Sequence, residues 1–378
     1  MARRLHIVID DAIPFIRGVL EPFFRVTYLP GSEITSQDLK EVSGIIVRTR
    51  TLCNQALLGN TGVRFVATAT VGTDHLDLVY LKENQIEWMH AAGCNANSVC
   101  QYVLAAIFEI LLQTKKTFKE TTLGIVGAGA IGSRLHRLAS ALQMRCLICD
   151  PPLAAQKENS DFSNLDDILD QSDIVSLHVP LTTAGPHPTH HRIGDIEIKR
   201  MRSNAFLINT SRGPVVDNEA LSYHLKSKTI AGAVLDVWEG EPNPDLTLLK
   251  QVLIGTPHIA GYSLDGKVNA SIQVVRALAQ YFRIDELKAF QLKLDPPESP
   301  AITGVFETEK LEFLHSVYKQ AYDINRDSSL LKRSPAQFEE FRKNYPIRRE
   351  PSAFILKADL YNEDNRDILQ KLGFNLCV

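Results

Sequence analysis

The sequence predicts an α/β protein with two parallel-sheet domains of the Rossmann-like or flavodoxin-like kind, a deep cleft, and a small C-terminal α/β domain. Three observations lead to this prediction. Short apolar runs alternate with helical patterns in two successive series, a glycine-rich turn opens the second series, and prolines at 296, 297 and 300 mark a linker. The 378 residues are enough for two or three domains.

The composition excludes several classes of protein. An apolar content of 44% is ordinary for a globular chain with a sizeable core, and a net charge of -3 gives no reason to expect a nucleic-acid partner. The N-terminal apolar run, residues 5–10, is too short for a signal peptide or a membrane span. The six cysteines are scattered, which indicates a reducing cytoplasm; Cys146 and Cys149 are interpreted as apolar strand residues. We expect a cytoplasmic protein that binds no membrane.

The first series predicts a small parallel sheet. Its apolar runs cover residues 5–10, 26–29, 44–47 and 65–70, with short helical patterns at 55–58 and 76–83. The loops at 48–51 and 68–73 carry hydroxyls, a glycine and arginines, and they follow strand ends. Such loops suit an anionic ligand, although ordinary loop chemistry explains them equally well. A strongly apolar helix over 98–114 then leads to the second series.

The stretch from 121 to 150 reads as strand, glycine turn, helix, strand and acid. This is the layout of a dinucleotide-binding unit, and an ordinary strand–helix turn is the alternative. Gly127 permits the tight turn, Gly129 lets the backbone approach a pyrophosphate, and Gly132 lets the helix pack on its strand. Ala130 and Ile131 complete the turn. Asp150 can accept hydrogen bonds from both ribose hydroxyls and repels a 2′-phosphate, so the expected cofactor is NAD.

Later strands are expected to end near residues 179, 210, 236 and 256, which completes six strands. A helix over 265–282 then returns to the first domain. The predicted domains are therefore 1–97 plus about 263–290, which binds substrate; 98–262, which binds NAD; and 291–378. The last segment shows a helical stripe over 311–321, a helix capped by Ser334 and Gln337, and a strand-like run over 353–357. Its small size favours an oligomer interface.

Three polar residues follow strand ends and are candidates for chemistry. Arg212 offers a fixed guanidinium for a carboxylate, His258 offers a base near neutral pH, and Glu241 can orient that imidazole. Each also has an ordinary explanation as a loop or turn residue. Asp236 is a candidate contact for the nicotinamide end of the cofactor. The histidines at 187, 190 and 191 have no acidic neighbour in sequence before Asp195, so no metal is expected.

At these residues the sequence resembles the D-isomer-specific 2-hydroxy acid dehydrogenases. The matching segments are VGAGAIG, LINTSRGPVVD, LDVWEGEP and TPHIAGYS, and the resemblance covers about residues 1–290. It implies a catalytic set of Arg212, Glu241 and His258, with His258 as the acid/base. The nicotinamide of NAD would carry the hydride.

Five features point to one subfamily that acts on a phosphorylated four-carbon acid. They are ATATVGTDHLD at 67–77, CDPP at 149–152, GPHPTHH at 185–191, HIAGYSLDGK at 258–267, and the C-terminal appendage. The resemblance implies a homodimer formed by that appendage. It implies substrate contacts at Thr49, Thr70 and Tyr262, with Arg48 beside them. The implied cofactor contacts after the glycine turn are Asp150, Val179, Thr210, Ser211, Arg212, Asp236 and Gly261.

Two departures and one hypothesis concern binding. Thr49 stands where a serine is usual and keeps the hydroxyl, whereas Val179 stands where a threonine is usual and loses a side-chain hydrogen bond to NAD. Arg348 or Arg349 is hypothesised to reach the substrate phosphate, from the same chain or across the dimer, with a solvated pair as the alternative. Three other functions stay open: a related dehydrogenase acting on glycerate, 3-phosphoglycerate or hydroxypyruvate, an NAD-sensing scaffold, and an inactive interaction module.

Overall fold

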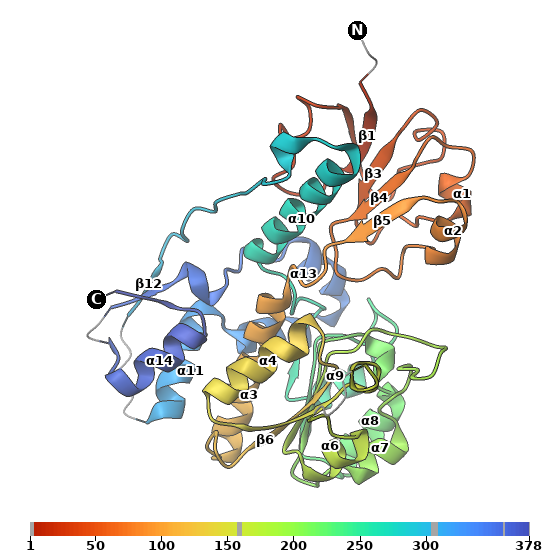
Figure 1. Cartoon of the computed structure of the whole chain (residues 1–378). Coiled ribbons are helices and arrows are strands. Elements are labelled where there is room, and N and C mark those ends of the chain that lie inside the picture. Colours follow the sequence, from red (N-terminus) through yellow and green to blue (C-terminus); the bar gives the residue numbers. More distant parts are fainter. Residues whose placement is uncertain (1–3, 157–160, 304–308, 358–359, 378) are drawn as a thin grey trace. The chain divides into compact units, whose positions relative to one another are not determined.

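The computed structural model describes residues 4–156, 161–303, 309–357 and 360–377 (Figure 1). The chain divides into two compact units. The first unit combines residues 1–95 with 263–295, and the second combines 96–262 with 296–378. The chain therefore leaves the first unit and returns to it once, through the segment that begins at Ser263.

The first unit contains a five-stranded parallel sheet in the order β2-β1-β3-β4-β5. The strands are β1 (His6–Asp10), β2 (Arg25–Leu29), β3 (Gly44–Val47), β4 (Phe65–Thr68) and β5 (Glu87–His90). Apolar residues alternate between the faces, so that α10 (Leu264–Phe282) packs on one face while α1 (Gln55–Leu58) and α2 (Leu78–Glu83) pack on the other. The fourth strand ends at Thr68, earlier than expected, because the chain turns into a hydrogen-bonded hydroxyl loop.

The second unit is organised around a six-stranded parallel sheet in the order β11-β10-β9-β8-β6-β7. Its strands are β6 (Thr122–Val126), β7 (Arg145–Cys149), β8 (Ile174–Leu177), β9 (Phe206–Asn209), β10 (Gly232–Leu235) and β11 (Ile254–Gly255). Val126 pairs with Leu177, Leu177 with Asn209, Asn209 with Leu235, and Leu235 with Gly255. The carboxyl ends are therefore level, and the loops that follow them share one edge of the sheet.

Helices cover both faces of this sheet (Figure 1). One face carries α3 (Ala96–Thr114) and α4 (Ala130–Ala141). The other carries α6 (Leu165–Gln171), α7 (Asp195–Arg200), α8 (Asn218–Lys226) and α9 (Leu246–Gln251), and the short α5 (Pro151–Ala154) follows β7. Helix α3 is long and apolar enough to cross a membrane, but most of it is buried in the protein. We interpret it as the core helix of this unit.

The C-terminal segment shares its core with α3, whereas the sequence predicted a separate domain from residue 291. Phe313, Leu314 and Val317 of α11 (Lys310–Ala321) belong to the same apolar cluster as the buried face of α3. The remaining elements are α12 (Ile324–Arg333), α13 (Phe338–Lys343), α14 (Glu363–Lys371) and a parallel sheet of β12 (Ala301–Ile302), β13 (Ile355–Leu356) and β14 (Asn375–Leu376). The C-terminal segment shares a core with α3 because so short a segment supplies too little apolar surface for a core of its own.

The predicted helix cap at Ser334 is wrong. Residues Pro335–Gln337 form a 3-10 turn, and the α-helix begins only at Phe338. The Ser334 side chain makes no capping hydrogen bond to this turn. The proline is therefore accommodated in the turn that precedes α13, where its missing N–H costs nothing.

Candidate active site

The glycine turn after β6 has the shape that a dinucleotide phosphate requires. Gly127 has a φ of 93°, which favours glycine, and a side chain there would collide with the His178 carbonyl. A side chain on Gly132 would collide with the Gly127 carbonyl. By contrast, a Cβ on Gly129 would meet nothing within 4 Å. Gly129 is the N-cap of α4 and leaves the N–H groups of the first turn, including those of Ala130 and Ile131, at an open face.

Asp150 lies directly beside this turn. Its carboxylate accepts a hydrogen bond from the Ala128 N–H at 2.8 Å and another from the Leu153 N–H at 3.0 Å. The acid thus links the glycine turn to the end of β7, at the position where the ribose of a bound dinucleotide would lie. Its predicted contact with the ribose stays a prediction.

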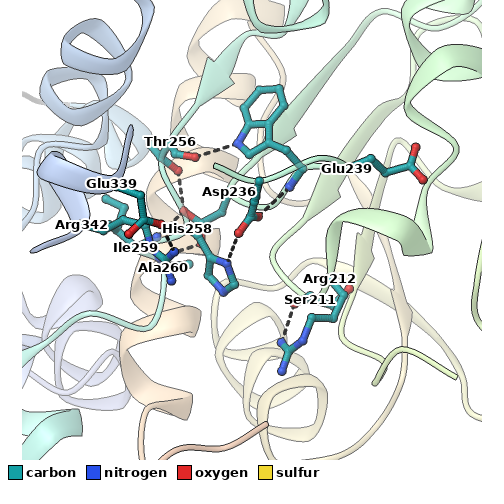
Figure 2. Close-up of polar contacts among 12 residues, drawn as sticks. Ser211, Arg212, Asp236, Glu239, Thr256, His258, Ile259, Ala260, Glu339 and Arg342 are labelled. Carbon is teal, nitrogen blue, oxygen red and sulfur yellow. Dashed lines mark hydrogen bonds and ion pairs between the residues drawn. The ribbon is translucent and has the colours of Figure 1, made fainter. Parts of the chain in front are cut away.

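Asp236 holds the loop that carries His258. It is 1% exposed, and its carboxylate accepts hydrogen bonds from the Thr256 hydroxyl at 2.7 Å, the Ile259 N–H at 2.7 Å and the Ala260 N–H at 2.8 Å (Figure 2). Its backbone carbonyl accepts the His258 N–H at 2.7 Å. The structure therefore shows Asp236 as a brace of the loop that carries His258, a contact that the sequence did not reveal.

His258 and Glu241 form a direct pair. The distance from His258 Nδ1 to Glu241 Oε2 is 2.8 Å, and the second oxygen of Glu241 accepts the Trp238 N–H at 2.9 Å. Burial acts to raise the pKa of Glu241, but the hydrogen bond and the charge of His258 keep that pKa below its ordinary value. An ionised Glu241 can only accept, so Nδ1 carries the proton and Nε2 of a neutral His258 is the ring's acceptor.

Arg212 follows β9 and reaches the same edge of the sheet. The Asn209 side chain donates to the Arg212 carbonyl at 2.9 Å, and Nη1 of Arg212 donates to the Ser211 carbonyl at 2.8 Å. A side chain on Gly213 would collide with the Trp238 carbonyl, so the loops after β9 and β10 pack closely. Figure 2 shows Arg212 and His258 on adjoining loops. The level strand ends thus bring together the three residues predicted to catalyse.

The remaining predicted cofactor contacts line this edge. Val179 is half-buried after β8, and Ser211 is oriented by Asn209, whose side-chain oxygen accepts the Ser211 hydroxyl at 2.8 Å. The Thr210 hydroxyl is buried and has no hydrogen-bond partner among the described residues. An orphaned hydroxyl on the same sheet edge as the open glycine turn is consistent with a polar ligand at this edge, so the residues present fit a bound dinucleotide. Gly261 follows the braced residues of the loop that carries His258.

The adjacent arginines of the C-terminal segment are not solvated, so that alternative is wrong. Arg348 is 6% exposed, donates to the Ser98 carbonyl at 3.3 Å and to the Ala260 carbonyl, and lies 4.5 Å over the Tyr322 ring. Arg349 is also buried. Arg348 therefore braces the end of the loop that carries His258 from inside the unit.

Arg342 of α13 is the residue that sequence reasoning missed. It pairs with Glu339 at 3.0 Å and lies beside Tyr262, with which it hydrogen-bonds (Figure 2 shows Arg342 near the loop that carries His258). Burial acts to lower the pKa of Arg342, but Tyr262, Glu241 and Glu339 raise it above its usual value. The segment FEEFRK is typical of an ordinary surface helix, so its pattern carries no signal for this contact.

The other predicted substrate residues lie in the first unit. The Thr70 hydroxyl donates to the Gly72 carbonyl at 3.0 Å and lies 2.8 Å from the Thr68 hydroxyl. Arg48 donates to the Ala12 carbonyl at 3.4 Å and is half-buried, and the exposed Thr49 lies in the same turn after β3. Their contact with a substrate stays a prediction.

The histidine loop has acidic neighbours that the sequence did not show. His191 Nε2 lies 2.7 Å from Glu239 Oε1, and its Nδ1 lies 3.8 Å from Asp217. Ligand atoms of His190, His191 and Glu239 lie within 4.8 Å of one another. The His190 and His191 rings are also stacked on each other. The expectation of no metal stays a prediction, but its stated reason was wrong.

Comparison with known proteins defines the class. Residues 108–260 match the family of the D-isomer specific 2-hydroxyacid dehydrogenase, NAD binding domain, and residues 294–373 match a domain of unknown function (DUF3410). A D-lactate dehydrogenase from Aquifex aeolicus, solved with NAD and lactic acid, superposes with a TM-score of 0.63 at 26% identity, covering 75% of this chain and 97% of that one. Fold and site thus define an NAD-dependent 2-hydroxyacid dehydrogenase.

Curated relatives narrow the class to one family. The erythronate-4-phosphate dehydrogenase of Bacteroides fragilis is 39% identical over 93% of this chain and 98% of its own length. The enzymes of that name from Salmonella arizonae and Cronobacter sakazakii are 38% and 40% identical, each over 98% of both chains. The chain belongs to the erythronate-4-phosphate dehydrogenase family.

Proposed function

We propose that this protein oxidises 4-phospho-D-erythronate with NAD to (R)-3-hydroxy-2-oxo-4-phosphooxybutanoate, a step of pyridoxal phosphate biosynthesis. The observation that carries the proposal is the His258–Glu241 pair, 2.8 Å between Nδ1 and Oε2, on loops level with the one that bears Arg212. A cationic anchor, a base and an orienting acid are what oxidation of a 2-hydroxy acid requires.

Each residue has a defined task in this reaction. Nε2 of His258 accepts the proton of the substrate 2-hydroxyl, while Glu241 fixes the ring and stabilises its cation. Arg212 binds the substrate carboxylate and polarises the carbonyl oxygen as it forms. The glycine turn, Asp150 and Thr210 would hold NAD, whose nicotinamide would supply the hydride acceptor for the hydrogen at C2. Oxidation therefore releases one proton and reduces one NAD.

Arg342 is the proposed contribution of the C-terminal segment to substrate binding. The substrate carries a phosphate, and Tyr262 is a predicted substrate contact that already hydrogen-bonds Arg342. A guanidinium beside that phenol provides the permanent charge that a phosphate needs. Arg342 thus replaces Arg348 and Arg349 as the candidate, because Arg348 is bound to backbone carbonyls inside the unit.

We also propose a soluble, cytoplasmic homodimer formed through the C-terminal segment. The support is the Ile347 side chain, a large apolar residue that is 78% exposed in a segment whose other apolar residues largely face the shared core. Light scattering of the purified protein will give the mass that decides between monomer and dimer.

The decisive experiment measures NADH formation on 2-hydroxy acids with and without a terminal phosphate. We expect the highest kcat/KM for 4-phospho-D-erythronate, and equal rates for 3-phosphoglycerate would favour the related dehydrogenase instead. His258→Ala should lower kcat by about 10²–10⁴ with little change in NAD affinity, and His187→Ala, on an exposed loop, serves as the control. NAD binding without turnover of any acid would favour a sensing scaffold or an inactive module.

A further inference from the structure

A cavity of about 460 Å³ lies where α3, α4 and the end of the chain meet in the second unit. Figure 1 shows α3, α4 and α14 in this part of the fold. None of the lining residues belongs to the loops that carry Arg212, Glu241 and His258. The lining residues with polar or charged side chains that matter here are Gln101, Arg134, Arg137, Glu350 and Lys371.

Two arginines give this cavity a positive wall. Arg134 and Arg137 are three residues apart on α4, so their side chains project from the same face of the helix. Neither forms an ion pair with any of the residues that the structure describes, whereas Lys371, on the opposite wall, is neutralised by Asp367 at 2.6 Å. The wall formed by α4 therefore presents two uncompensated guanidinium groups.

The inner end of the cavity presents acceptors instead of cations. Gln101 is 1% exposed; its Nε2 donates to the Arg349 carbonyl at 3.2 Å, while its Oε1 is buried and has no partner among the described residues. The neighbouring Glu350 is 3% exposed and accepts the Ser98 hydroxyl at 3.0 Å. A buried amide oxygen without a partner is costly, and a ligand hydroxyl would satisfy it.

We propose that this cavity is a second ligand site, distinct from the candidate active site, for a small phosphate monoester that carries free hydroxyls. The phosphate binds Arg134 and Arg137, whose guanidinium forks match its oxygens, and a hydroxyl donates to Gln101 Oε1. Glu350 sets the orientation of the ligand, because its carboxylate repels an anionic group from the inner end of the cavity. The cavity volume falls within the range of about 300–1,000 Å³ that is typical of small-ligand sites.

The test is calorimetric titration of the full-length protein, saturated with NAD, with sn-glycerol 3-phosphate as the probe. The double variant R134A/R137A should weaken binding by about tenfold or more, as the loss of two charge-assisted contacts predicts. Gln101→Met should weaken sn-glycerol 3-phosphate binding but leave inorganic phosphate binding unchanged. The matched control is K226A/K250A, which removes two exposed helix cations from outside the cavity.

Each contrary result overturns the proposal. Unchanged affinity in R134A/R137A would remove the arginines from the site, and loss of binding in Arg212→Ala alone would place the probe in the candidate active site. Absence of binding to the wild-type chain at about 1 mM, the upper end of the usual range for metabolites, would show that the cavity is unused or covered by a second copy. Unfolding temperatures of all variants, measured without ligand, identify any variant that is misfolded. If Gln101→Met is unstable, R134A/R137A still tests the proposal, because both arginines lie at the surface of α4.

Discussion

His258 is held in a left-handed backbone conformation, with a φ of 56°, that non-glycine residues rarely adopt. Such a conformation costs about 1–3 kcal/mol and persists only where the surroundings fix it. Here the Asp236 carbonyl accepts the His258 N–H, and the Asp236 carboxylate accepts the next two N–H groups. The strained backbone is thus that of His258, the residue whose ring hydrogen-bonds to Glu241.

The lowered pKa of Glu241 predicts a particular pH dependence of stability. A carboxyl whose folded pKa is depressed stabilises the fold above its unfolded pKa, which is 4.5 for a free glutamate, and this contribution is lost as the pH falls through the folded value. We therefore expect Glu241→Gln to lower the unfolding temperature at pH 7, and the difference from wild type to shrink as the pH falls below 4.5. Thermal melts of both proteins between pH 7 and pH 3 measure this difference in unfolding temperature. A constant difference across that range would contradict the role of the charge.

Arg342→Ala tests the contribution of the C-terminal segment to substrate binding. A hydrogen bond to a charged group is worth about 1.5–3 kcal/mol, so KM for the phosphorylated acid should rise about 10- to 100-fold. KM for NAD should change little, because the glycine turn does not involve α13. Lys343→Ala, the exposed neighbour on the same helix, is the control. Equal effects on substrate and on NAD would indicate general damage to the fold.

At the scale of elements, the glycine turn predicts opposite outcomes for two similar substitutions. A Cβ on Gly132 would collide with the Gly127 carbonyl, whereas a Cβ on Gly129 meets nothing within 4 Å. Gly132→Ala should therefore destabilise the second unit by about 1–3 kcal/mol. Gly129→Ala should leave stability unchanged but weaken NAD binding, because the new methyl group lies in the path of the pyrophosphate. Melting temperature and NAD titration separate the two, and unimpaired NAD binding in Gly129→Ala would place the cofactor elsewhere.

Sequence patterns predicted the buried strands well, because strands covered on both faces appear as continuous apolar runs. Strand β5, Glu87–His90, escaped prediction: it lies at the sheet edge, is partly exposed, and shows no such run. The candidate catalytic set was predictable because each member directly follows a strand end. The contacts of Arg342, His191 and Asp236 were not, since each depends on residues from other loops or helices that only the tertiary structure brings near.

At the scale of the molecule, the second unit depends on a core made by two distant parts of the chain. The Phe108 ring of α3 packs edge-on against Tyr318 at 5.0 Å, and Tyr102 lies 6.2 Å from Tyr322. Glu109 also pairs with His315 at 2.7 Å. The C-terminal segment therefore covers the apolar face of α3 even within one chain, whatever it contributes to a dimer.

Deleting residues 296–378 should consequently destroy the fold of the second unit and not merely convert a dimer into a monomer. Each large apolar side chain uncovered on α3 loses about 1.5–3 kcal/mol of burial, and several together exceed the net stability of about 5–15 kcal/mol that a domain has. We expect an aggregating product without a cooperative melt. Ile347→Asp is the matched variant, because its exposed side chain can be changed without opening the core, and it should stay folded and bind NAD. A soluble truncated chain with wild-type NAD affinity would show instead that α3 needs no cover from the C-terminal segment.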